Sequence, residues 1–397
     1  RSLLGAAARN RWLVAIGALW LVGFIALVAT IAPPPVVVTH WANGHMMDRT
    51  TLLPAFAEQF NGEHHETRSG SRIEVRLIRA NSGEIAGELS SRVSYGSAID
   101  REKADPTIVT PAADHWVVDL NYSLGRQVLD AASVETVATT YIGIVTSREI
   151  AECLGWPVRE IGFAEIVELA SDARGWSSYP CAKPEWGREA LLAFTYPSRS
   201  STARSVLYTL YSIAAGKPAE ELTVADVTRP DVLRYVRRFQ SAVDCYVPDT
   251  LDLNSKILAS PSCAQFFFIA EDNLVKLYQG KLSVPVGSAA VRKTLERDLV
   301  MIYPKEGAII HNHSAFVVKG DIVSERQTEA AKLWITFLRD EAQQRAFMQE
   351  GFRRTSPGPC LDPLGSPFSP CASTPQRPIY PDRIDPAVAD TILRAWE

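Results

Sequence analysis

The sequence predicts an α/β protein in two halves, preceded by one transmembrane helix. Two observations support this fold class. Short apolar or β-branched runs alternate with segments of helical periodicity along most of the chain, a pattern typical of parallel α/β sheets. Near the start, an uncharged apolar run covers residues 12–32, and three prolines follow it. We therefore expect residues 36–397 to contain the folded part.

Residues 12–32 have the length and polarity of a membrane-spanning helix. Twenty-one residues at 1.5 Å per residue reach ~30 Å, the hydrocarbon thickness of a bilayer. Three arginines precede the run, and no Lys or Arg follows it before Arg49. The positive-inside rule then places the N-terminus in the cytoplasm. We predict residues 1–35 as a cytoplasmic stub and anchor in the cell membrane, with the globular part extracytoplasmic.

A cleaved signal peptide is the alternative, because it also has a basic start and an apolar run. Signal-peptide apolar regions are usually ~7 to 15 residues long, which is shorter than this run. Pro33 directly follows the small-residue site at residues 30–32 and should hinder cleavage. Length therefore favours the uncleaved anchor.

The composition is that of an exported globular protein. Apolar residues make up 46% of the chain and charged residues 22%, with a net charge of -4. This leaves enough apolar mass for two ordinary cores and no basic patch to hold a phosphate backbone. Nucleic acid is not an expected partner.

The cysteine count is even, which suits an oxidising compartment. No pair has the C-x-x-C spacing of a thiolate metal site. The simplest of fifteen connectivities joins neighbours in sequence. These predicted pairs are Cys153 with Cys181, Cys245 with Cys263, and Cys360 with Cys371.

The first half alternates strands and helices. Residues 36–39 and 73–78 are β-branched or alternating runs that predict strands, and residues 106–111 contain a third short strand. Between them, apolar residues recur at helical spacing over residues 52–62 and after residue 81. This order implies a parallel sheet. Ligands bind such sheets outside the carboxyl ends of the strands. The turns at residues 41–44, 81–83 and 111–113 are thus the places where we expect ligand contacts.

The second half repeats this order. Residues 141–145 and 191–195 predict buried strands, and residues 163–169 predict a short helix. The cluster Ser198–Thr202 opens another helix, whose first amides lack intrahelical partners and carry partial positive charge. Hydroxyls and amides there could converge on an anion or a polar group. The alternative is that one serine caps the helix and the others are solvated.

The chain resembles the type II periplasmic solute-binding proteins, the broad group that includes molybdate-, sulfate- and phosphate-type binding proteins. The resemblance covers roughly residues 36–355, and its motifs specify the fold better than the ligand. The segments that carry it are His313–Gly320, Ala330–Leu338, Glu341–Gln344, Gly351–Arg354, Phe56–Asn61 and Phe194–Ala203.

The resemblance implies two lobes that close on a solute at a hinge. We place the first lobe at residues 36–130 plus 305–360 and the second at residues 131–304. By position, the ligand-contacting residues would lie in five turns. They are Trp41, Asn43, Gly44, Ser82, Gly83, Pro111, Ser200, Ser201, Thr202 and Glu271.

The chain departs from the anion binders of this group in two ways. The first turn offers Trp41 and Asn43 where oxyanion binders often have a serine. Glu271 and Asp272 stand where they would repel an anionic ligand. An organic or cationic solute is the resulting expectation.

Neither a metal site nor a catalytic site is expected. His311 and His313 could face the same way if extended, but no third ligand lies at a diagnostic spacing. We interpret them as loop or cleft-edge residues. The sequence has no nucleophile elbow, Gly-rich phosphate loop or paired catalytic carboxylates. We therefore expect no cofactor and no enzyme activity.

Residues 361–397 have the composition of a disulfide-stapled linker. They end in the start of a helix, residues 385–397, which suggests that the chain leads to a further domain. Some membrane-anchored relatives of this group carry a von Willebrand factor A domain beyond such a linker. The metal-binding motif of that domain is not present in these residues.

The leading hypothesis is a membrane-anchored solute-binding protein that captures a small solute for a membrane transporter or for sensing. The alternative is a protein-interaction or scaffold module with the same fold, and an exported enzyme comes third. A cleft plugged by Trp41 or by the segment at His311, beside a large exposed apolar patch, would favour the scaffold.

Overall fold

The computed structural model describes residues 33–47, 52–95, 104–129, 134–250, 252–254, 264–281, 298–320, 322–372, 375 and 377–396. The predicted transmembrane segment, residues 12–32, lies outside these described residues. Within them, no helix combines the length and the apolar character needed to cross a bilayer.

The described strands form one hydrogen-bonded path in the order β2-β1-β3-β9-β4-β7-β5-β6, with β8 beside β4 and β10 beside β9. The strands are β1 Val36–Ala42, β2 Ile73–Arg79, β3 Ile108–Thr110, β4 Glu135–Ser147, β5 Leu192–Thr195, β6 Val243–Val247, β7 Phe266–Ala270, β8 Leu299–Ile302, β9 Ala308–Val317 and β10 Pro378–Ile379. The helices are α2 Gly44–Met47, α3 Leu52–Gly62, α4 Ser82–Tyr95, α5 His115–Ser123, α6 Arg148–Cys153, α7 Phe163–Ser171, α8 Ser201–Ala215, α9 Val224–Val227, α10 Pro230–Ser241, α12 Glu271–Tyr278, α14 Glu325–Leu338, α15 Glu341–Gln349 and α16 Pro386–Trp396.

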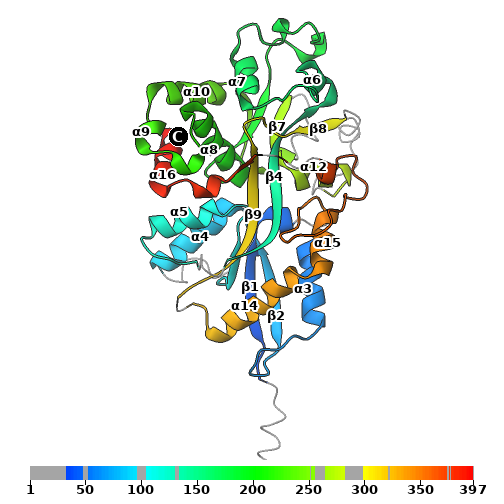
Figure 1. Ribbon diagram of the computed structural model, residues 1–397. Coiled ribbons are helices and arrows are strands. Elements are labelled where there is room, and N and C mark those ends of the chain that lie inside the picture. The colour runs from blue at the N-terminus through cyan, green and yellow to red at the C-terminus, as the bar shows by residue number, and fades with distance from the viewer. Residues whose placement is uncertain are drawn as a thin grey trace, which may run out of the picture.

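The molecule has two lobes, joined by the long strands β4 and β9 (Figure 1). The lower lobe contains β1, β2 and β3 with helices α3, α4, α5, α14 and α15. The upper lobe contains β5, β6, β7 and β8 with helices α6 to α10 and α12. The predicted parallel pairing holds in both lobes, since β1 pairs in parallel with β2 and β3, and β5 with β6 and β7. β9 is antiparallel to both β3 and β4, which links the two sheets.

Each lobe has its own aromatic core. In the lower lobe Phe60, Trp334 and Phe337 have ring centroids 5.2, 5.3 and 5.6 Å apart. In the upper lobe Phe194, Phe239 and Phe268 pack at 5.1, 5.5 and 5.9 Å. All six rings are buried. Two cores of this kind allow the lobes to be separate folded bodies on a shared pair of strands.

Most predicted elements are present, and three are longer than predicted. β1 runs on through Ala42, so Trp41 belongs to the strand and not to the turn after it. β4 begins at Glu135 and β9 at Ala308. His311 and His313 are therefore fully buried strand residues, and their interpretation as loop residues is wrong. The full lengths of β4 and β9 were not predicted, because polar side chains in a sequence suggest exposed residues. In the structure, neighbours from both lobes cover these two strands.

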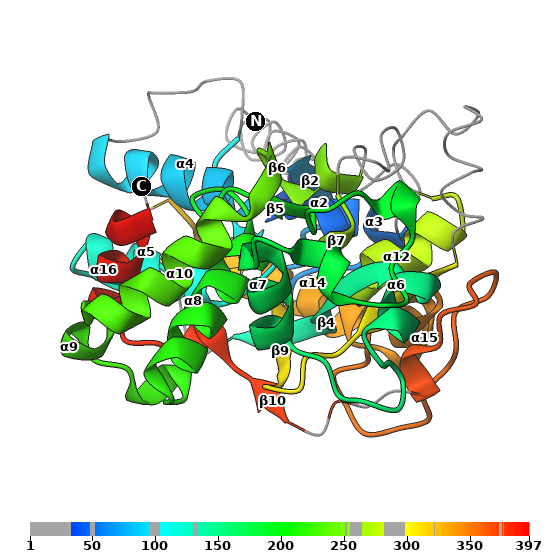
Figure 2. The same cartoon turned by 90° about the horizontal axis from the view of Figure 1, so that it is seen from above.

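The C-terminal segment packs on the body, unlike the linker that we expected for residues 361–397. β10 pairs with the start of β9, and Ala308 donates its backbone N–H to Arg377 O at 2.8 Å. Helix α16 adds Val388 and Ile392 to the upper core. It lies beside α5 and α9 and so contacts both lobes (Figures 1 and 2). Its apolar stripe is the physical reason, because a helix with one apolar face needs a surface to cover it.

Two of the three predicted disulfides are present. Cys153 is bonded to Cys181, with Cα atoms 5.5 Å apart, and Cys360 to Cys371 at 5.7 Å. Cys245 is also disulfide-bonded, and its predicted partner Cys263 lies outside the described residues.

A buried ion pair ties α12 to the segment after α15. Arg353 donates to both carboxylate oxygens of Glu271, at 2.7 and 2.9 Å, and Glu271 is 0% exposed. Tyr303 also donates to this carboxylate, and Arg353 donates to Pro370 O at 2.9 Å. The pair therefore connects elements that are distant in the sequence.

We predict that Arg353→Met destabilises the protein by about 3–5 kcal/mol, because it leaves the Glu271 carboxylate buried without its cation. Arg345→Met is the matched control on α15. Arg345 pairs with Glu341 on the surface, and loss of such a pair costs about 1 kcal/mol or less. Denaturant unfolding of both variants measures the difference. Equal, small effects would contradict a structural role for the buried pair.

Candidate functional site

A cavity of about 280 Å³ lies between the lobes, at the carboxyl ends of the parallel strands. The lower lobe lines it with the segments that follow β1, β2 and β3: residues 43–45, residues 79–82 with Glu84, and Ala112. The upper lobe lines it with residues 199–201 after β5, residues 249–250 after β6, and α12 after β7. Turns after six parallel strands thus surround one cavity.

The two lobes touch each other beside the cavity. Ser201 Oγ donates to Ser82 Oγ at 2.9 Å, and Trp116 Nε1 donates to Ser201 Oγ at 2.9 Å. Gly83 N donates to Arg199 O at 3.4 Å. These bonds join the start of α4 and α5 to the start of α8. The conformation is therefore closed.

Gly83 is part of this contact, because the backbone at residues 198–199 of the upper lobe lies close to it. A Cβ atom at this position would lie 2.6 Å from Ser198 O and 2.9 Å from Arg199 Cα. Both are backbone atoms, which cannot move aside as a flexible side chain can. Glycine is therefore required here for full closure.

Arg204 provides a second contact between the lobes. Its guanidinium lies 3.5 Å from the ring centroid of Trp116 and donates to Asp119 at 2.9 Å. Trp116 and Asp119 belong to α5, whereas Arg204 belongs to α8. A cation over an indole face and a buried ion pair both favour the closed arrangement.

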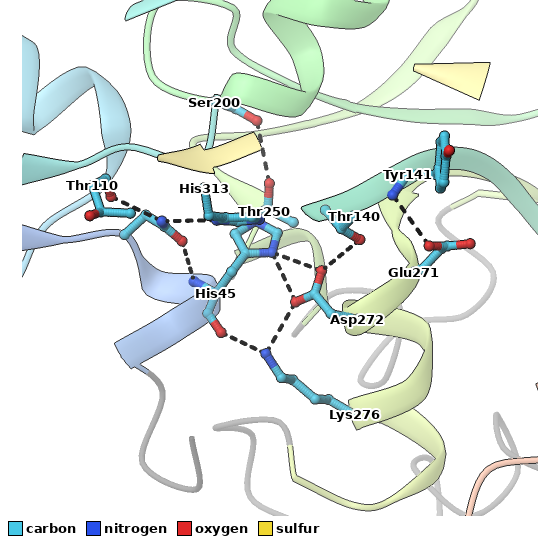
Figure 3. A network of polar contacts seen from close by, with 11 residues as sticks. His45, Thr110, Thr140, Tyr141, Ser200, Thr250, Glu271, Asp272, Lys276 and His313 are labelled. Atoms are coloured by element: carbon cyan, nitrogen blue, oxygen red, sulfur yellow. Dashed lines mark hydrogen bonds and ion pairs between the residues drawn. The ribbon is translucent and has the colours of Figure 1, made fainter. Parts of the chain in front are cut away.

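A buried network of charges lies at the wall of the cavity (Figure 3). Lys276 Nζ donates to His45 O at 2.6 Å and to Asp272 at 3.1 Å, and His45 Nδ1 lies 3.1 Å from the same carboxylate. Thr140 donates to Asp272 at 3.4 Å. Burial alone raises the pKa of Asp272, but Lys276 and His45 hold it well below the usual value. The carboxylate is therefore ionised and neutralised by the protein itself.

The structure brings together half of the predicted ligand-binding residues. Asn43, Gly44, Ser82, Ser200 and Ser201 line the cavity. Asn43 is also structural, because its amide donates to Thr110 O and contacts His313.

The other five predicted residues do not line the cavity. Trp41 is buried in the core of the lower lobe, and its indole donates to Ala104 O at 3.2 Å. Pro111 and Thr202 are buried next to lining residues, and Gly83 lies in the contact between lobes. Glu271 is occupied by Arg353. The turns after the strands do reach the cavity, but the end of β1 and the direction of each side chain were not predicted.

Several lining residues were missed. Arg79 ends β2, and Arg199 lies inside the predicted serine cluster. Both arginines are next to turns that were predicted to contact a ligand, and this position could have identified them. Asn273 and Lys276 lie in α12, after the strand at Phe268. Asp249 and Thr250 follow β6, a strand without a clear apolar pattern.

Four histidines are buried in the described part of the chain. His40 contacts Thr110 and Trp334, His311 contacts Ser205, and His313 contacts Asn43. Burial lowers the pKa of His40 and of His311 to about 3, and it lowers the pKa of His115 and of His313 well below the ordinary value. All four rings are therefore neutral in the folded protein. In the described part of the chain, no group of His, Cys, Asp and Glu side chains has metal-binding geometry.

Solved structures share this architecture. A periplasmic thiamin-binding protein matches with a TM-score of 0.59 and 10% identity, over 91% of this chain and 96% of that one. A protein of Trichodesmium (IdiA, FutA) in complex with iron and citrate matches with a TM-score of 0.55 and 11% identity, over 91% and 100%. AfuA of Actinobacillus pleuropneumoniae, with fructose-6-phosphate bound, matches with 0.54 and 12%, over 91% and 97%. The chain thus has the two-lobe fold of type II periplasmic solute-binding proteins. No family model and no curated protein matches its sequence.

We predict that the buried histidines make the fold sensitive to acid. An unfolded histidine has a pKa near 6.5, so below this pH protons bind the unfolded chain first. Each neutral histidine then removes about 1.4 kcal/mol of stability per pH unit. For His40 and His311 this contribution is complete above pH ~6.5 and is lost as the pH falls towards about 3.

Chemical denaturation between pH 7.5 and 5 measures this slope. His40→Gln should reduce the slope of the free energy of unfolding against pH by about 1.4 kcal/mol per pH unit, because the unfolded variant takes up one proton fewer. His64→Gln, at an exposed position, is the matched control for loss of an imidazole. The interpretation fails when His40→Gln and the parent protein have the same slope.

Proposed function

We propose that this protein is an extracytoplasmic solute-binding protein that captures a small solute between its lobes, and that it is not an enzyme. The observation that carries the proposal is the cavity itself. Turns after six parallel strands, three from each lobe, line one cavity between the lobes. Open α/β sheets place ligands at this position.

Lobe closure supplies the mechanism. We assign residues 36–130 plus 305–360 to the first lobe and residues 131–304 to the second. A solute in the cavity contacts both lobes only when the lobes are closed, so it binds the closed form more tightly and shifts the equilibrium towards it. Contacts between the lobes at Ser82, Gly83, Trp116 and Ser201 also favour the closed form.

The scaffold alternative has less support. Trp41 and His311 do not plug the cavity, since both are buried in the body of the protein. The neighbours of known structure hold small solutes, namely thiamin, iron with citrate, and fructose-6-phosphate. Their identities to this chain are 10–12%, so they support capture of a solute without naming it.

We further propose that residues 12–32 tether the protein to the cell membrane, with a membrane transporter or sensor as the recipient of the solute. This rests on the length and polarity of that segment. An association with a von Willebrand factor A domain rests only on the resemblance to membrane-anchored relatives.

We predict that the full chain sediments with membranes and resists extraction at alkaline pH. A variant that lacks residues 1–32 should instead appear in the soluble fraction, because it has lost the apolar segment. Fractionation followed by immunoblotting compares the two. A full chain that is released by alkali would rule out the anchor but not solute binding.

We predict that a cognate solute raises the thermal stability of the full chain in non-ionic detergent. At 100 times its dissociation constant a solute adds about 2.7 kcal/mol to the free energy of unfolding. The panel contains oxyanions, organic acids, sugar phosphates, sugars, amino acids and polyamines. Absence of a shift with any member would favour the scaffold alternative.

Gly83→Ala separates solute binding from closure in the same experiment. The added methyl group would collide with the backbone at Ser198 and Arg199 and hold the lobes apart. We expect at least about tenfold weaker binding, which corresponds to 1.4 kcal/mol, and a longer distance between fluorophores on α10 and α14. Gly87→Ala is the matched control on α4, since its Cβ would meet no atom within 4 Å. Equal behaviour of the two variants would contradict closure around Gly83.

A further inference from the structure

The cavity has more hydrogen-bond donors than the protein uses. Lys276 is 1% exposed and its ammonium has three N–H donors, of which His45 O and Asp272 take two. The ammonium also lies 4.6 Å from the ring centroid of Phe352, and within the described residues the third N–H has no oxygen or nitrogen acceptor. Ser82 Oγ accepts from Ala112 N and from Ser201, and its own hydrogen has no acceptor there either.

A third donor comes from the pair Ser200 and Thr250, which share one hydrogen bond of 3.3 Å between their hydroxyls. Ser200 Oγ also accepts from Ala203 N. The two hydroxyl groups have two hydrogens, and their shared bond uses one of them. The other hydrogen is therefore available as a donor. Buried donors without acceptors are unfavourable, so an occupant that brings acceptor oxygens would satisfy all three.

Two arginines add positive charge at the edge of the cavity. Arg79 and Arg199 both line the cavity and are exposed residues. Arg199 also attracts the carboxylate of Asp252 electrostatically. Two acidic residues, Glu84 and Asp249, line the cavity as well, and each accepts a backbone hydrogen bond. Glu84 accepts from Asn81 N and caps α4, and Asp249 accepts from Asp252 N.

The acidic pair at the start of α12 does not repel an anion. Glu271 is neutralised by Arg353, and Asp272 by Lys276, while His45 is hydrogen-bonded to the Asp272 carboxylate. Neither carboxylate lines the cavity. This removes the reason for which the sequence disfavoured an anionic solute.

The size and lining of the cavity indicate an organic solute rather than a bare inorganic anion. The volume of about 280 Å³ far exceeds the ~10–15 Å³ that one water needs. A bare oxyanion would therefore leave much of the space unfilled. Among the described residues that line the cavity, none is Phe, Tyr or Trp, so there is no platform for an aromatic ring. Asn273 is 3% exposed, and among the described residues its Oδ1 has no hydrogen-bond partner. It can therefore accept from a hydroxyl of the solute when its amide turns towards it.

We propose that the solute is a small, hydroxylated, non-aromatic organic anion, a carboxylate or a phosphate ester. This rests on the proposed function of solute capture. Lys276, Ser82 and the Ser200–Thr250 pair donate to its acidic oxygens, Arg79 and Arg199 neutralise its charge, and Asn273 accepts from its hydroxyl.

The test measures thermal shifts of the full chain in non-ionic detergent with malate, glycerol 3-phosphate, succinate, sulfate, glycerol and spermidine. The expected result is a shift with malate or glycerol 3-phosphate, a smaller one with succinate, and none with the rest. A shift with glycerol or spermidine alone would overturn the anionic solute while leaving solute capture intact. A thermal shift with sulfate as large as the shift with malate would contradict the inference that the solute is an organic molecule. No shift with any probe would overturn the proposed function as well.

Substitutions locate the effect. Arg79→Gln and Arg199→Gln should each weaken binding of the organic anion about tenfold, since each removes a charge-assisted contact. Arg234→Gln, exposed on α10 outside the cavity, is the matched control and should leave binding unchanged. Asn273→Leu should abolish the preference for malate over succinate. Equal losses at Arg79 and Arg234 would overturn the assignment.

Discussion

The pairing of β4 with β9 is the constraint on which the rest of the structure depends. The two strands run antiparallel from Glu135 beside Ala315 to Ile142 beside Ile309. Beyond this shared stretch, β9 continues along β3 in the lower lobe, and β4 continues along β7 and β8 in the upper lobe. Each lobe is thus anchored to one end of the same ribbon. The carboxyl ends of β1, β2 and β3 consequently face those of β5, β6 and β7 across the cavity.

Local patterns in the sequence were enough to predict the elements of each lobe. β-branched runs marked β1 and β2, and helical spacing marked α3, α4 and α8, so the turns that bind ligands in this fold could be named. The serine cluster before α8 held two residues of the cavity, Ser200 and Ser201. These predictions succeeded because strand and helix periodicity depends on neighbours in the chain.

Predictions failed where the partner of a side chain is remote in the sequence. Glu271 and Asp272 were interpreted as charges in the cleft, but their partners are Arg353, 82 residues away, and His45, 227 residues away. No local pattern reveals these distant partners, although Asp272 and Lys276 also form a pair with the ordinary i,i+4 spacing of a helix. β4 and β9 were underestimated for a related reason. Their Thr and His side chains look solvated in sequence, yet both strands are covered from two sides. Several of these polar side chains have buried partners, as Thr140 has in Asp272, His311 in Ser205 and His313 in Asn43.

The C-terminal segment changes what opening of the cleft involves. Helix α16 is fixed to the upper lobe by Val388 and Ile392, while it also contacts α5 of the lower lobe. Separating α5 from α8 therefore breaks the Trp116–Ser201 bond, the Arg204–Asp119 pair and the contact of α5 with α16 together. A solute captured as we propose would not have to hold the lobes closed alone, because these contacts already favour closure. It would contribute the difference between three buried donors left without acceptors and the same donors satisfied, which is the differential affinity that closure requires.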